Sequence, residues 1–180
     1  MSYSPAEIYA LQVEQRVHDD LFHADISRLD LSRRIAHLNL HLSKYCGDLV
    51  LAKEGGNESA AMKALVDCAI ISSSAATALN VDLSKVRAGD GAIPDTVPFL
   101  LALVVRVGRL AKATEALDHV EDYPFRRVWE QEFSSIFHMV ISEIDSREGE
   151  TGANALSKIK RRLEFVRSKI NFAMIAGGAP

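Results

Sequence analysis

A row of side chains that could bind a metal ion or a phosphate recurs at helical spacing in residues 37–48. His37, His41, Lys44 and Asp48 follow one another in steps of four, three and four residues, which places them along one side of a helix. Two histidines four residues apart project from adjacent turns and can share one metal ion. Asp48, about three turns from His37, could join them only through a partner helix. The polar flank of an amphipathic helix gives the same row, so both interpretations remain open.

Asp67 is the second candidate, because it lies within the apolar run 64–71. A carboxylate withdrawn from water without a partner costs several kcal/mol, so Asp67 needs a cation, a metal ion or several hydrogen-bond donors. Two interpretations stand: a salt bridge to Lys44 or an arginine, or a carboxylate that serves a ligand. We expect Asp67 to be buried and to face Lys44 or Asp48, because helices joined by a short loop pack antiparallel.

Three segments, residues 37–49, 64–67 and 78–83, together resemble a known enzyme superfamily. They are similar to the all-α nucleoside triphosphate pyrophosphohydrolases, the MazG-like and dimeric dUTPase-like proteins. That superfamily carries an E-E-x-x-E helix, a helix with E-x-x-D and often a closing phrase similar to L-G-I-D-L. Its carboxylates hold Mg²⁺, and it cleaves nucleoside triphosphates to monophosphate and pyrophosphate. The resemblance therefore implies a helical bundle, a nucleotide ligand and Mg²⁺, a hard cation that prefers oxygen ligands.

The motif positions assign roles to individual residues. Asp48 stands at the last acid of the first motif and Asp67 at the aspartate of the second, which makes both of them metal-ligand candidates beside His37 and His41. Lys44 and Tyr45 occupy the two adjacent glutamate positions, and Ala64 replaces the glutamate of E-x-x-D. The resemblance thus implies a ligand site at Lys44, Tyr45, Asp48 and Asp67, with Lys44 and Tyr45 contacting phosphate directly.

The leading hypothesis is a MazG-like protein that binds a nucleotide or phosphorylated small molecule, with pyrophosphohydrolase activity left open. The alternative is a non-catalytic helical protein that keeps the fold and works through interaction or oligomerisation. A third hypothesis is a metal protein that uses His37, His41 and an acid from another helix.

Apolar stripes with steps of three and four residues predict an all-α fold. The expected single domain, 1–180, is an antiparallel bundle of about six helices. Residues 30–79 and 97–148 could be two related helical hairpins within it, and this point stays open. A loop is expected at about 86–97 and a frayed tail at 177–180. Helices are predicted from the capping box of Ser4 and Glu7, from about Asp30 to Gly55, from Glu58 to Leu79, from Val97 to Leu117, after Pro124 and after Gly152.

Two of these helices carry predictions about their faces. The first helix is expected to bury Ala10, Val13, Val17, Leu21 and Ala24. The run from His18 to His23 superficially suggests a His–Asp metal phosphohydrolase, but its side chains diverge on a helix and are expected to form an exposed face. The basic residues of the last helix are likewise expected to be exposed: Lys158, Lys160, Arg161, Arg162, Arg167 and Lys169.

Composition narrows the class of protein. The 180 residues are 48% hydrophobic and 25% charged with a net charge of −3, which fits a globular protein without a drive towards nucleic acid. Cys46 and Cys68 are far apart and predict reduced core residues. The absence of a secretion signal and the short apolar stretch 97–105 predict a cytoplasmic protein that avoids membranes. The small residues of helix 58–79 predict a homo-oligomer.

Overall fold

The computed structural model describes residues 3–86, 93–94, 96–148 and 153–176, with side chains up to residue 168. Within these ranges the chain forms seven helices and no strand, which confirms the all-α prediction. The one-turn α2 is additional to the six predicted helices. Most of the loop expected at 86–97 and all of the tail 177–180 lie outside the described residues. The helices are α1 (Pro5–Phe22), α2 (Ala24–Ser27), α3 (Leu31–Glu54), α4 (Glu58–Ala78), α5 (Phe99–Asp118), α6 (Phe125–Glu148) and α7 (Ala155–Ala176).

The capping box predicted at Ser4 and Glu7 forms, and two other helices also begin at side-chain caps. The Ser4 hydroxyl accepts a hydrogen bond from the backbone of Glu7, and the Glu7 carboxylate accepts one from the Ser4 backbone at 2.8 Å. The side chains of Asp30 and Asn57 cap α3 and α4. Asn80, just beyond α4, adopts the left-handed conformation with φ 60°. Local sequence therefore fixes where these helices begin and end.

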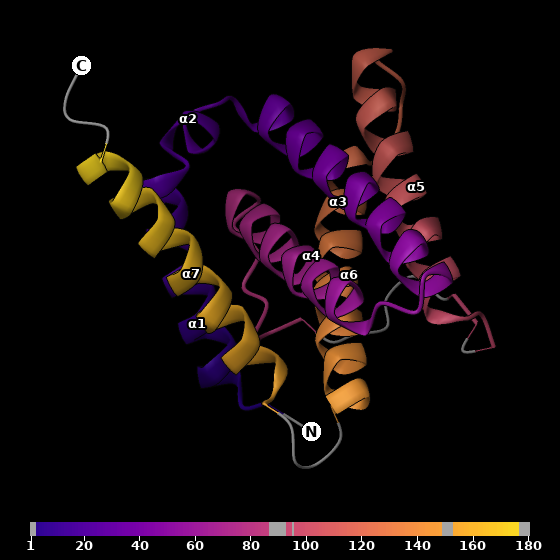
Figure 1. The fold of residues 1–180 in the computed structure, drawn as a ribbon. Coiled ribbons are helices and arrows are strands. Elements are labelled where there is room, and N and C mark those ends of the chain that lie inside the picture. Colours follow the sequence, from indigo (N-terminus) through magenta and orange to yellow (C-terminus); the bar gives the residue numbers. More distant parts are fainter. Residues whose placement is uncertain (1–2, 87–92, 95, 149–152, 177–180) are drawn as a thin grey trace.

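The central element of the bundle is α4, which packs against α1, α3, α6 and α7 (Figure 1). It is the one helix of the described residues long and apolar enough to span a membrane, and 67% of its apolar window is buried inside the bundle. Its small side chains allow neighbouring helices to approach closely. We expected them to contact a second copy, but they are buried within the chain: Ala61, Ala64, Ser72, Ser73, Ser74, Ala75 and Ala76.

The predicted stripes of α3 and α6 form the core around α4. Ile35, Leu42 and Phe133 are fully buried. Both cysteines are buried and unpaired, and burial raises the pKa of the Cys46 thiol to about 11. Neighbouring helices pack in pairs, α3 on α4 and α5 on α6, and the relation between the two pairs stays a prediction. The other buried core positions of the two stripes are Leu38, Leu49, Ala52, Trp129, Ile136, Val140 and Ile144.

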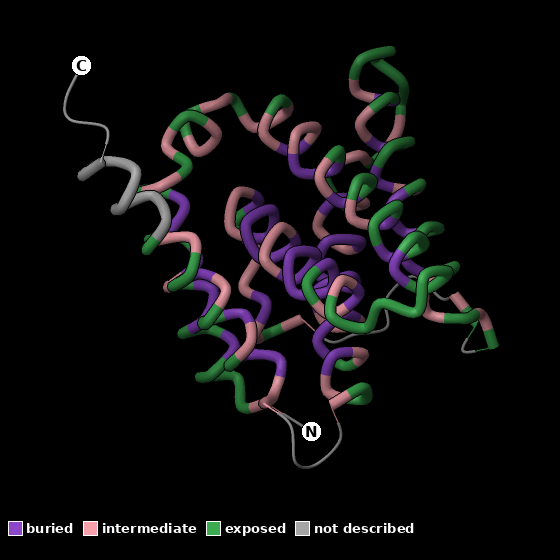
Figure 2. Tube along the Cα trace, viewed as in Figure 1, coloured by how far each residue is buried: buried purple, intermediate pink, exposed green. Residues whose placement is uncertain are grey.

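The predicted core face of α1 is wrong. Val13, Val17 and Leu21 are 44%, 49% and 66% exposed, Ala10 is also exposed and Ala24 is half-buried. Figure 2 shows exposed as well as buried positions along α1. The expectation of an exposed face around His18 and Asp19 is wrong as well. The residues that α1 buries are Ile8, Leu11, Gln12, Gln15, His18 and Asp19.

Polar contacts explain why α1 buries this side and exposes its apolar stripe. The Gln12 amide donates to the carbonyl oxygen of Val81 at 2.7 Å and to Thr77 Oγ1 at 3.2 Å. Its oxygen accepts from the backbone N–H of Leu83 at 3.1 Å. One glutamine therefore makes hydrogen bonds to three polar groups around the end of α4. The free energy gained by pairing these groups exceeds what burial of the apolar stripe on the opposite side of α1 would contribute.

Candidate functional site

A cavity of about 210 Å³ lies among α1, α2, α3, α4 and α7. We call it the histidine cavity, because four histidines line it. Concave sites with a largely apolar wall and a few convergent polar groups are the usual form of ligand sites in proteins. Its apolar wall is Ile26, Leu38, Ile70, Ile71, Leu163 and Val166, and its ionisable residues are His18, Asp19, His23, Arg34, His37, His41, Tyr45, Asp67 and Arg162.

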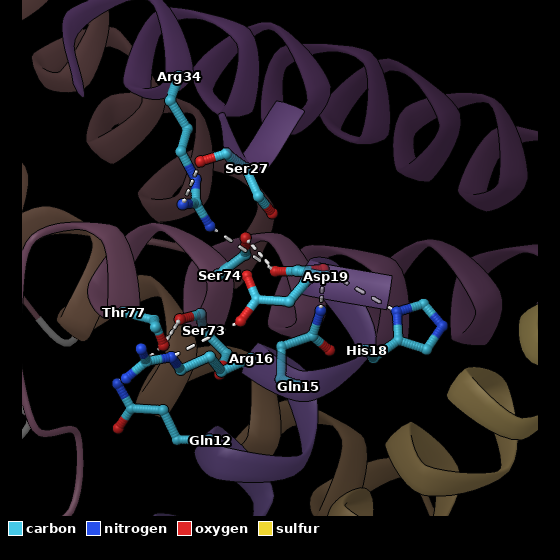
Figure 3. Close-up of polar contacts among 11 residues, drawn as sticks. Gln12, Gln15, Arg16, His18, Asp19, Ser27, Arg34, Ser73, Ser74 and Thr77 are labelled. Atoms are coloured by element: carbon cyan, nitrogen blue, oxygen red, sulfur yellow. Dashed lines mark hydrogen bonds and ion pairs between the residues drawn. The ribbon is translucent and has the colours of Figure 1, made fainter. Parts of the chain in front are cut away.

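Asp19 is the central residue of a polar network at the cavity and contacts several of its other members (Figure 3). Its carboxylate accepts from Ser74 Oγ at 2.6 Å and from Gln15 Nε2 at 2.7 Å. The guanidinium of Arg34, from α3, lies 4.0 Å from the same carboxylate, and His18 Nδ1 lies 3.9 Å away. Asp19 therefore joins α1, α3 and α4, and its buried charge is compensated by hydrogen-bond donors from α1 and α4 and by the nearby charge of Arg34 on α3.

Asp67 occupies another part of the cavity wall and is 6% exposed, which confirms that it is buried. Its partner is Arg162 of α7, whose Nε lies 2.8 Å from Oδ1 and whose Nη2 lies 3.3 Å from Oδ2. Of the two predicted salt-bridge partners of Asp67, an arginine is confirmed. Lys44 is wrong, because it is exposed and its Nζ lies 4.2 Å from the centre of the Tyr45 ring. The two-point contact with a planar guanidinium is the stronger arrangement.

The aromatic side chains of the cavity form two groups. The rings of His37 and His41 are 4.7 Å apart, and the Tyr45 ring lies 6.0 Å from His41. The rings of His18 and His23, from the end of α1, are 5.5 Å apart. These rings offer flat surfaces and nitrogen atoms to a bound molecule.

Burial controls the ionisation of the first group. It lowers the pKa of His41, with Lys44 and His37 adding to the effect and Asp67 opposing it, so His41 is neutral at neutral pH. Burial, with the charge of Asp67 adding to it, raises the pKa of Tyr45 to about 12, so its phenol keeps its proton. This wall of the cavity is therefore a source of uncharged donors and acceptors.

Unpartnered polar atoms concentrate around this cavity. Among the described residues, thirteen buried side-chain nitrogen or oxygen atoms have no hydrogen-bond partner, and six belong to residues that line it. His18 is the extreme case, because it is 2% exposed and neither of its ring nitrogens has a hydrogen-bond partner. Buried polar groups are normally hydrogen-bonded, so this concentration makes the cavity the candidate binding site. The six atoms are Gln15 Oε1, His18 Nδ1 and Nε2, Ser27 Oγ, Arg34 Nε and His41 Nδ1.

The predicted site residues are only partly brought together. His37, His41, Tyr45 and Asp67 line the histidine cavity. Asp48 is exposed and borders a separate, open hollow between α3 and α4, which Asp67 also reaches. In the described ranges, no three His, Cys, Asp or Glu side chains are arranged to hold a metal ion. The four metal-ligand candidates therefore do not converge on one point.

Sequence reasoning missed His18, Asp19, Arg34 and Arg162. Three polar residues of α1 recur at helical spacing, later in the chain than the buried apolar residues of its first turns. They are Gln12, Gln15 and Asp19. That spacing was the available signal for a buried polar face. For Arg162 no such signal exists, because only the packing of α7 on α4 brings it to Asp67.

Comparisons with protein-family models, with curated proteins and with solved structures find no significant match. The likeness to the nucleoside triphosphate pyrophosphohydrolases therefore depends on the motifs in α3 and α4 and stays a prediction.

Proposed function

We propose that this chain binds a nucleotide or a related small phosphorylated metabolite in the histidine cavity. The observation that carries the proposal is the concentration of unpartnered buried polar atoms around a cavity that also has an apolar and aromatic wall. A nucleotide combines the same two chemistries, a flat base and a charged phosphate.

Arg34 is the residue best suited to the phosphate. Its side chain is 15% exposed, and its Nε has no partner. Its other contacts are long, at 3.4 Å to the Ser27 carbonyl and 4.0 Å to Asp19. A guanidinium carries five N–H donors, so Arg34 retains donors for an anion. Arg162, in contrast, already makes two close contacts with Asp67.

The base suits the wall formed by α3 and α4. The rings of His41 and Tyr45 provide aromatic surface, and Ile70 and Ile71 provide apolar surface. Gln15 and His18 carry unpartnered polar atoms that can recognise the edge of a base. This arrangement supports binding and selectivity.

The proposed site binds its ligand without cleaving it. Asp48 and Asp67 are the two carboxylates of this chain that stand at acidic positions of the pyrophosphohydrolase motifs. Asp48 borders a separate hollow, and Asp67 is held in an ion pair with Arg162. A metal-assisted cleavage needs carboxylate oxygens free to hold Mg²⁺.

A thermal-shift screen tests the binding. We expect a nucleoside monophosphate or triphosphate, with or without Mg²⁺, to stabilise the protein by about 2.7 kcal/mol at a hundredfold excess over Kd. For a chain of this size that raises Tm by roughly 5–10 °C. Arg34→Met should lose most of the rise, measured from the variant's own Tm.

The matched control for that screen is Arg16→Met. Arg16 lies on α1, its side chain is 70% exposed and it does not line the cavity. Its rise in Tm should equal that of the unchanged protein. A full rise in Arg34→Met, or no rise with any nucleotide, contradicts the proposal.

A second candidate function, self-association, has its own observation. Tyr9, Val13, Val17 and Leu21 are exposed and lie four residues apart, which makes an apolar stripe about 18 Å long on α1. Two copies related by a two-fold axis would place Tyr9 of one opposite Leu21 of the other, and Val13 opposite Val17. Such a self-complementary contact is the usual form of a dimer interface.

Light scattering on purified protein tests this interface. We expect a dimer mass for the unchanged chain and a monomer mass for Val17→Glu, because an unpaired carboxylate opposes burial of the stripe. Leu51→Glu is the control, since Leu51 is 73% exposed on α3, away from the stripe. A monomer mass for the unchanged chain at high concentration, or a dimer of Val17→Glu, sinks this candidate.

A further inference from the structure

We infer that His37 and His41 form a binding site for a divalent transition metal ion of the Zn²⁺, Cu²⁺ or Ni²⁺ class within the histidine cavity. The inference is independent of the nucleotide, because it concerns the metal ion alone. It also differs in chemistry from the Mg²⁺ that the family resemblance implies.

The separation of the His37 and His41 rings suits one shared metal ion. When two imidazoles bind one ion at about 2.0–2.1 Å with a tetrahedral angle between them, their ring centres lie about 5 Å apart. The rings of His37 and His41 are 4.7 Å apart with an angle of 56° between their planes. The two ring planes are tilted rather than parallel, and rotations about the side-chain bonds can bring one nitrogen of each ring to a shared ion. Their positions on consecutive turns of α3 keep the two side chains adjacent.

The cavity also holds ring nitrogens without a hydrogen-bond partner. His41 Nδ1 is buried and makes no hydrogen bond. His18, which also lines the cavity, is 2% exposed and neither of its ring nitrogens has a hydrogen-bond partner. Imidazole nitrogens suit Zn²⁺, Cu²⁺ and Ni²⁺, whereas Mg²⁺ prefers carboxylates and water.

The composition of the cavity sets the expected coordination. Because the described residues contain no three metal-binding side chains in one arrangement, the protein supplies two ligands from α3. Water or a bound anion completes the coordination, as at sites that keep open positions. A two-histidine site should be weaker than a structural zinc site, and Asp67 cannot strengthen it while Arg162 holds its carboxylate.

Titration calorimetry with Zn²⁺ alone on the metal-free chain tests the site. We expect one Zn²⁺ per chain, no heat from Mg²⁺, and at least tenfold weaker Zn²⁺ binding in both His37→Gln and His41→Gln. The control is His119→Gln, which removes an exposed imidazole outside the cavity and should leave Zn²⁺ binding unchanged.

Imidazole NMR on the unchanged protein gives a second readout that does not depend on the variants folding. The signals of His37 and His41 should shift on addition of Zn²⁺, whereas that of His138, which is bound to the Leu83 carbonyl outside the cavity, should stay in place. No binding of Zn²⁺ at millimolar concentration, or equal binding in the two variants and the unchanged chain, overturns the inference. Nucleotide binding measured with EDTA present distinguishes a failure here from a failure of the proposed function.

Discussion

Replacing Arg162 by methionine is expected to lower the free energy of unfolding by about 3–5 kcal/mol, because it leaves a buried carboxylate without its counter-charge. Asp67 is 6% exposed, and the two close contacts from Arg162 compensate its charge. Methionine keeps much of the length of the side chain, so the loss reports the charge more than the packing. Urea unfolding followed by circular dichroism measures it.

Neighbouring positions give the controls for that experiment. Arg161→Met alters an exposed arginine of the same helix and should change stability by less than about 0.5 kcal/mol. Asp67→Asn should cost less than Arg162→Met, because the Arg162 side chain is 25% exposed and water can reach its charge. A loss below 1 kcal/mol in Arg162→Met would show that the Asp67 charge is compensated by other means.

The second large effect is expected for Asp19→Ala, at about 3 kcal/mol. The change removes the acceptor of Ser74 and Gln15 and the nearest carboxylate to Arg34, and hydrogen bonds to a charged group contribute about 1.5–3 kcal/mol each. Asp20→Ala is the matched control, because the adjacent Asp20 side chain is 58% exposed. Equal stability of the two variants would contradict the structural role of Asp19.

The same variant separates stability from binding. If the Asp19 network positions Arg34 for a phosphate, Asp19→Ala should also reduce the nucleotide-induced rise in Tm. A variant that is destabilised but keeps the whole rise would place the ligand away from this side of the cavity.

Most of the fold could be predicted because its signals are local. The capping residues Ser4, Asp30 and Asn57 mark helix starts, and the stripes of α3 and α6 have one apolar side each. In α1, by contrast, two different sides of the helix could be buried: the apolar side with Val17 and Leu21, or the polar side with Gln12. Hydrogen bonds between Gln12 and the backbone of Val81 and Leu83, in the segment after α4, decide which side is buried. The spacing along α1 shows its polar side but does not identify these partners.

The candidate site could be predicted only where it lies on one element. His37, His41 and Tyr45 share a side of α3, and Asp67 was identified as an unusual charge in an apolar run. The partner of Asp67 could not be identified, because Arg162 is 95 positions away along the chain and looks like any other basic residue of an amphipathic helix.

The most direct test of the account is the location of a bound nucleotide. Nucleoside monophosphates and triphosphates titrated into the unchanged protein with EDTA present, and followed by imidazole NMR, report each histidine separately. We predict saturable shifts at His18 and His41, which line the histidine cavity, and none at His119 or His138, which lie elsewhere. Saturable shifts confined to His119 or His138, or no shift at any histidine, would contradict the proposal that the histidine cavity is a nucleotide site.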